Sequence, residues 1–232
     1  FSDPRWVSKM DYLFVDEAGQ VSLANTLAIS TSTKNIILIG DQMQLSQPIQ
    51  GIHSGNSGKS SLDFLLGDYD TIPLSRGIFL DVTRRLNEKI CDYISSSFYE
   101  SRLKSHPVTK DRSVSLELKE IKDEGIFYLP VDHQDCTQKS DEEAKIIKDY
   151  YSKILGKNYT EDNKKKKMTI ENIMMIAPFN MQVNNLKKIL NRKEARIGTI
   201  DKFQGQESKV VFISMTSSDP ENLPRHKEFF FS

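Results

Sequence analysis

Short apolar runs alternate along the chain with longer segments in which apolar residues recur at helical spacing. Five runs have the length of strands, at residues 12–15, 36–39, 126–129, 173–176 and 210–213. Uninterrupted apolar runs are typical of strands that are covered on both faces of a parallel sheet. Helices are expected at about 22–31, 87–99, 141–155 and 180–192. The alternation predicts an α/β fold with parallel sheets and right-handed crossovers.

Polar signals refine this pattern at three places. Ser140 followed by Glu143 predicts a capping box at the start of the third helix. Residues 53–61 are rich in Gly and Ser, and residues 156–167 hold four consecutive lysines, so both segments are expected to be loops or insertions. The lysine run 164–167 has two interpretations, a contact with nucleic-acid phosphates or an ordinary solvated loop, and the second is the commoner use of a lone charge run.

Composition narrows the class of protein. The chain has 232 residues, enough for one large domain or two modest ones. Lys and Arg number 32 and so do Asp and Glu, which excludes a globally basic nucleic-acid binder but leaves room for a local basic groove. The two cysteines cannot form a disulfide framework, which favours a reducing compartment, the cytoplasm or, in a eukaryote, the nucleus. No apolar run approaches the roughly 18 residues of a membrane span, so no membrane partner is expected.

Two of the apolar runs end in acidic residues. The first, 12–15, is followed by Asp16 and Glu17, and the second, 36–39, by Gly40, Asp41 and then Gln44. Ligands of parallel α/β sheets bind at the carboxyl ends of strands, and the gap between the runs suits one crossover helix. The carboxylates could hold a cation at that edge, or they could be an acidic helix start and a plain strand exit.

These residues resemble motifs of a known family. Asp-Glu-Ala-Gly-Gln at 16–20 and Gly-Asp-Gln-Met-Gln-Leu at 40–45 are similar to motifs II and III of superfamily 1 helicases, in the 5′→3′ branch that includes the nonsense-mediated-decay helicase and bacterial nuclease–helicase fusions. Three further parts of the chain resemble motifs of that family in the same order, namely the motif IV region at 79–87 and 98–103, the strand-end loop at 177–183 and motif V at 197–207. The resemblance covers nearly the whole chain.

The resemblance implies a fold and an arrangement of domains. It predicts the RecA-like P-loop NTPase fold, with 1–75 as the second half of a first RecA-like domain and 76–232 as most of a second, carrying an inserted Lys-rich loop near 156–168. The chain opens with Phe1 and contains neither a P-loop nor the family's last arginine motif, so it is expected to be a piece of a longer protein. Gly58-Lys59-Ser60 looks like the end of a P-loop, but His53 stands where that motif needs glycine.

The resemblance also implies roles for individual residues. It implies that the protein uses ATP and Mg²⁺, with Asp16 as the magnesium ligand and Glu17 as the general base. Gln44 would sense the γ-phosphate, and Arg85 would be the arginine finger that stabilises the transition state. Further nucleotide contacts are implied for Asp41, Gly205 and Glu207. Arg84 stands one position from the family's arginine and is the alternative to Arg85. Pro178, Asn180 and Thr199, just past strands, are expected to hold the backbone of a nucleic-acid strand through neutral hydrogen bonds. Each has an ordinary structural alternative, such as a strand terminator for Pro178 or a surface arginine for Arg85.

The resulting hypothesis is a fragment of an ATP-dependent helicase or translocase that moves on single-stranded nucleic acid, with DNA favoured over RNA. The isolated chain is expected to be inactive, because its acids lack the P-loop lysine of the missing N-terminal portion. Two alternatives stay open, a non-catalytic nucleic-acid or protein-binding module derived from a helicase core, and a different P-loop enzyme such as a nucleotide kinase or GTPase.

Overall fold

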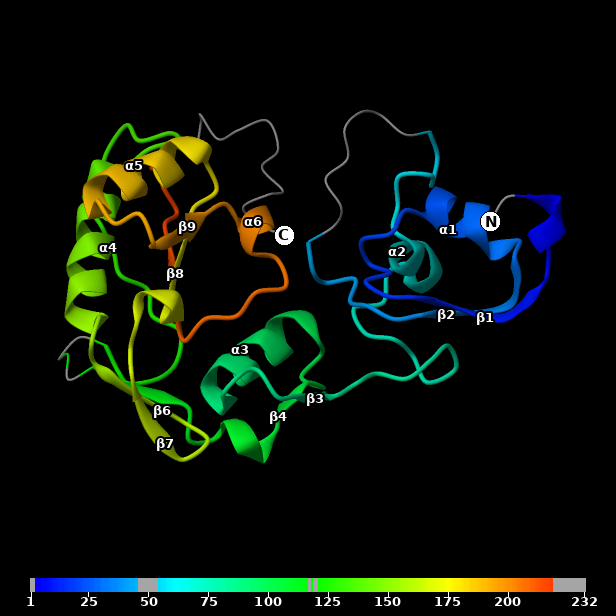
Figure 1. Ribbon diagram of the computed structural model, residues 1–232, viewed down its shortest axis with the longest axis horizontal. Coiled ribbons are helices and arrows are strands. Elements are labelled where there is room, and N and C mark those ends of the chain that lie inside the picture. Colours follow the sequence, from blue (N-terminus) through cyan, green and yellow to red (C-terminus); the bar gives the residue numbers. More distant parts are fainter. Residues whose placement is uncertain (1–2, 46–53, 117, 119–120, 219–232) are drawn as a thin grey trace. The chain divides into compact units, whose positions relative to one another are not determined.

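The computed structural model describes residues 3–45, 54–116, 118 and 121–218 of the chain. The residues fall into two compact units, unit 1 with 1–82 and 92–104, and unit 2 with 83–91 and 105–232. Each unit carries parallel strands with helices beside them (Figure 1), which confirms the predicted α/β class. The domain boundary expected between residues 75 and 76 stays a prediction.

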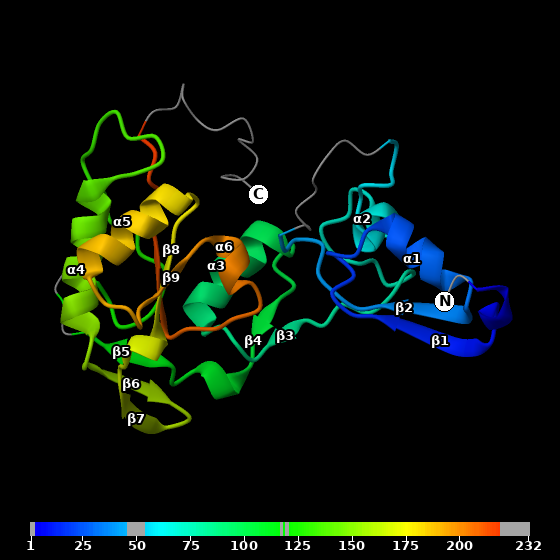
Figure 2. The ribbon, with the colours of Figure 1, turned by 45° about the horizontal axis from the view of Figure 1, so that its top comes forward.

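Unit 1 is built on two parallel strands, β1 (Met10–Val15) and β2 (Thr33–Leu38). Helix α1 (Leu23–Ser30) connects them and begins at Ser22, whose hydroxyl accepts a hydrogen bond from the Asn25 N–H. Helix α2 (Ser61–Leu66) lies beside α1, on the same side of the two strands (Figure 2). A short 3₁₀ turn, η1 (Pro4–Trp6), precedes β1. The crossover helix expected between the first two strands is therefore present.

The core of unit 1 is small and lies on one face of its sheet. Val15, Ala18 and Leu62 are buried together there, under the two helices. On the opposite face, the side chains of Tyr12, Phe14, Ile37 and Ile39 are 59, 62, 38 and 45% exposed. The expectation that both faces are covered is wrong for this sheet, because α1 and α2 lie on the same side of it.

Unit 2 contains a parallel sheet in the order β10–β8–β9, formed by Val210–Ile213, Ile173–Ile176 and Arg196–Gly198. The central strand β8 is buried over most of its length. Helices α4 (Asp141–Ile154) and α5 (Asn180–Leu190) contact each other and share the core with the sheet, and the short α6 (Ile200–Phe203) follows β9. The apolar run 173–176 correctly predicts a strand covered on both faces, whereas in β10, from the run 210–213, Val211 and Ile213 are 45 and 66% exposed on one face.

The remaining elements are a helix of 11 residues and several short strands and 3₁₀ turns. They are α3 (Glu88–Phe98), the paired strands β3 (Val82–Thr83) and β4 (Lys104–Ser105), β5 (Ser113–Ser115), β6 (Asn158–Glu161), β7 (Lys164–Lys167), and the 3₁₀ turns η2 (Pro107–Thr109) and η3 (Ile170–Asn172). Within the described part of the chain, no helix has both the length and the apolar character to cross a membrane.

Three expectations on local structure are corrected. Residues 126–129 form no strand, and Tyr128 among them is 85% exposed, because no neighbouring strand pairs with the run. The segment 156–167 is a β-hairpin rather than a loop, because β6 and β7 pair in antiparallel register around a two-residue turn. The capping box at α4 is half formed. Ser140 accepts from the Glu143 N–H, but the Glu143 carboxylate turns inward to the Thr216 N–H and the Ser214 hydroxyl.

Candidate nucleotide and nucleic-acid site

The acidic loops of unit 1 follow two adjacent strands that run in the same direction. Asp16 comes directly after β1, and Asp41 lies just beyond β2. Backbone hydrogen bonds continue the ladder past the strands, from the Ile39 N–H to the Val15 carbonyl and from the Ala18 N–H to the Ile39 carbonyl, both 2.8 Å. The loops that carry the two acids therefore leave the same edge of the sheet, where parallel α/β folds bind ligands.

Two glycines allow these loops to touch. A Cβ added at Gly19 would lie 2.4 Å from the carbonyl oxygen of Asp41, and one added at Gly40 would lie 2.7 Å from the Ala18 nitrogen. Both obstacles are backbone atoms, so neither could move without moving a loop. The close approach explains why positions 19 and 40 are glycine.

The Asp16–Glu17 pair projects into solvent with a constrained backbone. Both side chains are exposed, and one Asp16 carboxylate oxygen accepts the Glu17 N–H at 3.0 Å. Glu17 has φ of 51°, a left-handed conformation that costs a residue with a Cβ about 1–2 kcal/mol. Conformations of this kind cluster at functional sites. Here the left-handed turn sets the direction in which the Glu17 carboxylate leaves the sheet edge.

Asp41 is held from three sides. Its carboxylate accepts hydrogen bonds from the Met43 N–H at 3.0 Å, the Gln44 side-chain amide at 3.1 Å and the Tyr99 hydroxyl at 2.5 Å. Burial, together with the hydrogen bond to Asp41, raises the pKa of Tyr99 far above its usual value, so the phenol stays a donor. Asp41 is thereby fixed as an acceptor, and the amide of Gln44 is bound to it rather than free.

The donor set suits a magnesium ion brought by a nucleotide. Among the described residues, no group of three His, Cys, Asp or Glu side chains lies close enough to hold a metal ion by itself. Mg²⁺ is usually bound by one or two carboxylates together with substrate phosphates and water. The exposed carboxylate of Asp16 matches that pattern, because it offers hard oxygen donors and leaves room for phosphate, while the neighbouring Glu17 carboxylate stays free of the ion.

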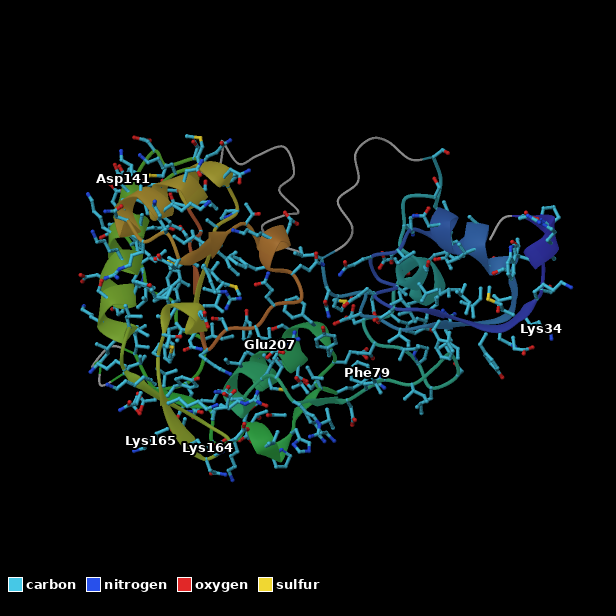
Figure 3. All side chains as sticks on the ribbon, viewed as in Figure 1. Lys34, Phe79, Asp141, Lys164, Lys165 and Glu207 are labelled. Carbon is cyan, nitrogen blue, oxygen red and sulfur yellow. The ribbon has the colours of Figure 1, made fainter. Side chains whose placement is uncertain are left out.

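Arg85 and Glu207, 122 positions apart in the sequence, form an ion pair in unit 2. The Nε of Arg85 lies 2.7 Å from a Glu207 carboxylate oxygen, and both side chains are 56% exposed (Figure 3 labels Glu207). The guanidinium of Arg112 donates to the backbone carbonyls of Arg84 and Arg85 and thus fixes this stretch. The side chain of Arg85 therefore touches the motif V segment, whereas Arg84 contributes its carbonyl. Arg196 holds the Glu207 side of the pair by donating to the Glu207 carbonyl at 3.1 Å.

The residues expected to bind nucleic acid gather at one edge of the unit 2 sheet. Pro178 follows β8, Asn180 opens α5, and Thr199 follows β9 and precedes α6. The Ala177 N–H donates to the Gly198 carbonyl at 3.2 Å, which joins the two loops at the carboxyl ends of these parallel strands. Gly205 lies further along, with φ of 73° and no atom within 4 Å of an added Cβ, so its backbone conformation rather than crowding calls for glycine.

The P-loop-like segment has a structural role. The Ser60 hydroxyl accepts from the Asp63 N–H, and the Asp63 carboxylate accepts from the Ser60 N–H, so the two form the capping box of α2. The Lys59 carbonyl accepts from the Leu23 N–H. His53 lies outside the described residues. The segment therefore forms the start of α2 and is hydrogen-bonded to the start of α1. This agrees with the expectation that it is not a phosphate-binding loop.

Sequence reasoning missed two supporting residues, Tyr99 and Arg112. Tyr99 is 58 positions from Asp41, and no local pattern links them. Arg112 acts through backbone carbonyls, which leave no trace in side-chain identity. The structure thus brings together Asp16, Glu17, Asp41 and Gln44 in unit 1, and separately Arg85 with Glu207, and Pro178 and Asn180 with Thr199, in unit 2.

The chain is similar to several helicases of known name. It is 26% identical to the DNA polymerase alpha-associated DNA helicase A of Schizosaccharomyces pombe, over 91% of this chain and 33% of that protein. It is 25% identical to the DNA replication ATP-dependent helicase/nuclease DNA2 of Gallus gallus, over 95% of this chain and 21% of that protein. An uncharacterized ATP-dependent helicase of Methanocaldococcus jannaschii is 23% identical, over 89% of this chain and 31% of that protein. The chain therefore spans about a third or less of the length of these relatives.

A family model described as an AAA domain matches residues 68–230, which is most of the chain. Three of the segments that resemble helicase motifs, the motif IV region, the strand-end loop at 177–183 and motif V, lie within these residues, whereas 16–20 and 40–45 precede them. The chain therefore belongs to the AAA domain family, and its relatives are superfamily 1 helicases, as the motifs predict.

Proposed function

We propose that this chain is part of an ATP-dependent translocase that moves along single-stranded nucleic acid, DNA in preference to RNA. The observation that carries the proposal is the pair of loops in unit 1 that present Asp16 and Glu17 beside Asp41 and Gln44. Backbone hydrogen bonds join these loops, and Gly19 and Gly40 permit their close approach. The names of the relatives, two of them called ATP-dependent helicases, support the same reaction class.

In this proposal each group has one task. Asp16 holds Mg²⁺, which would neutralise charge on the β- and γ-phosphates, and Glu17 accepts the proton of the attacking water. Gln44, bound to Asp41, exchanges that partner for the γ-phosphate or the water. Arg85 leaves Glu207 to stabilise the transferred phosphoryl group, while Gly205 and Glu207 belong to the nucleotide-binding surface. Pro178, Asn180 and Thr199 hold the backbone of the strand.

The test is ATP hydrolysis by the full-length protein with and without single-stranded DNA or RNA. Glu17→Gln should lower kcat by about 10²-fold or more, the usual contribution of a general base, and leave ATP binding intact. Asp11→Asn is the matched control, because Asp11 is an exposed acid at the other end of the same strand, paired with Lys34. Unchanged turnover in Glu17→Gln would refute the assignment of the base.

The 232-residue chain alone should show no ATP turnover, since its sequence holds no complete P-loop. Strand binding without stimulated hydrolysis in the full-length protein would instead favour a non-catalytic binding module. A strict preference for guanine nucleotides would favour a GTPase.

A further inference from the structure

The lysine run lies on the edge strand of a small antiparallel sheet in unit 2. Strands β5, β6 and β7 pair in that order, and β6 and β7 meet at a turn made of Asp162 and Asn163. Both turn residues have positive φ, 52° and 57°, the backbone of the tight type I′ hairpin. A tight turn fixes the register, so each lysine of β7 has a defined face. Lys164 and Lys165 lie at the outer end of this hairpin (Figure 3).

On one face of this sheet, a carboxylate compensates the positive charge of the lysines. Tyr159 and Glu161 of β6 stand directly opposite Lys166 and Lys164, and Tyr159 is buried in the core. The Glu161 carboxylate pairs with Lys166 at 3.0 Å and with Lys209. We call this face, which carries Tyr159, Glu161, Lys164 and Lys166, the inner face. Glu161 is the one carboxylate in the three strands, and it lies on the inner face.

The other face has a different composition. By the same register it presents six side chains, Ser113, Ser115, Asn158, Thr160, Lys165 and Lys167. These strand positions include no carboxylate, and within the described part of the chain no hydrogen bond or ion pair of their side chains is found. Both lysines are exposed. We call these six residues the lysine face.

The chemistry of the lysine face matches a phosphodiester backbone. The Cα atoms of two lysines two positions apart on one strand are separated by about 6.6 Å, the rise of two residues, and both side chains leave the same face. Hydroxyl and amide groups beside them can donate to phosphate oxygens, as Ser, Thr and Asn do in protein–nucleic-acid contacts. Lysines also protect edge strands from pairing, but that role needs charge only and not a row of hydroxyl and amide groups beside the lysines.

We propose that the lysine face binds the phosphate backbone of a nucleic-acid strand, as a contact additional to the loops at Pro178, Asn180 and Thr199. Strand β7 ends six residues before β8 begins, whereas those loops follow the other end of β8 and β9. With the lysine face as a further contact, unit 2 would bind a longer stretch of the nucleic acid. This inference rests on the proposed action on nucleic acid.

The experiment compares two double variants of the full-length protein that remove the same charge from the same strand. Lys165→Gln with Lys167→Gln alters the lysine face, and Lys164→Gln with Lys166→Gln alters the inner face. Affinity for a fluorescent single-stranded oligonucleotide is measured between 50 and about 300 mM salt. Loss of two phosphate contacts should lower the slope of log K against log salt by about 1.4, at 0.7 per contact, in the first variant only.

The proposal would be overturned if the two double variants had the same slope of log K against log salt, or if both lost the same affinity for the oligonucleotide. Poly-glutamate serves as a second probe. If the first variant loses affinity for poly-glutamate but keeps the wild-type slope for the oligonucleotide, the lysine face binds an acidic polypeptide and the proposal is wrong. Absence of oligonucleotide binding by the unaltered protein would instead refute the proposed function itself.

Discussion

At the residue scale, the backbone of the neighbouring loop leaves no room for a side chain at Gly19. Because an added methyl group would overlap the Asp41 carbonyl at 2.4 Å, Gly19→Ala should force the two acidic loops apart and cost about 1–3 kcal/mol of unfolding free energy. Gly55→Ala is the benchmark, since it meets no atom within 4 Å and pays only for its positive φ, about 1 kcal/mol. Urea unfolding of both variants checks this. A Gly19→Ala protein as stable as wild type would show that the loops can separate freely.

Tyr99 gives a second prediction at this scale. Tyr99→Phe keeps the ring beside Phe79 but removes the donor to Asp41, which should cost about 1 kcal/mol because the phenol is only half buried. The pKa of Tyr99 is raised in the folded protein, so its stabilisation is fully present below the usual tyrosine pKa of about 10 and is lost as pH rises above it. The stability difference between wild type and Tyr99→Phe should therefore be constant from pH 7 to 9 and shrink above pH 10. A difference that grows in alkali would contradict the role of the phenol as donor.

At the scale of elements, the hairpin β6–β7 depends on one carboxylate. The ion pair with Lys209, and then that with Lys166, holds the pKa of Glu161 below its usual range. A lowered carboxyl pKa stabilises the fold above the usual value of about 4.3, and this contribution is lost as pH falls through the folded value. Glu161→Gln should thus cost about 1 kcal/mol at pH 7 and progressively less below pH 4. The control is Glu171→Gln, whose carboxylate has no ion pair among the described residues. A pH-independent cost would argue against the ion pairs.

The four predicted helices are all present, as α1, α3, α4 and α5, because local signals define them, whereas α2 and α6 were not predicted. Ser140 caps α4 and Ser22 caps α1 where the sequence predicts helices to start. Two predictions were wrong for opposite reasons, that 126–129 is a strand and that 156–167 is a loop. An apolar run becomes a strand only if a partner lies beside it, which local sequence cannot show. The hairpin has almost no apolar alternation, and its one signal, the Asp162-Asn163 turn, is hidden among polar residues.

The candidate site was predictable where motifs are local. Asp16 and Asp41 share a sheet edge because parallel strands end together, a rule that needs only the order of elements. The contacts that support them join distant segments, such as Tyr99 with Asp41 or Arg85 with Glu207, and depend on how the chain folds back. Glu207 and Tyr99 both lie in segments that resemble motifs of the family, but the resemblance implies a role for Glu207 only, and no feature of the sequence links Tyr99 to Asp41.

At the scale of the whole molecule, the two units have unequal cores. Unit 2 buries an extensive cluster that includes Leu186, whereas the described cluster of unit 1 is Val15, Ala18 and Leu62. Since stability grows with buried apolar surface, unit 1 should unfold at a lower urea concentration than unit 2. Leu62→Ala should lower the first midpoint and Leu186→Ala the second, each costing about 2–5 kcal/mol in its own unit. Far-UV circular dichroism against urea, with hydrogen exchange to assign each step, measures both. One transition shifted equally by the two substitutions would mean that the units unfold as a single cooperative body.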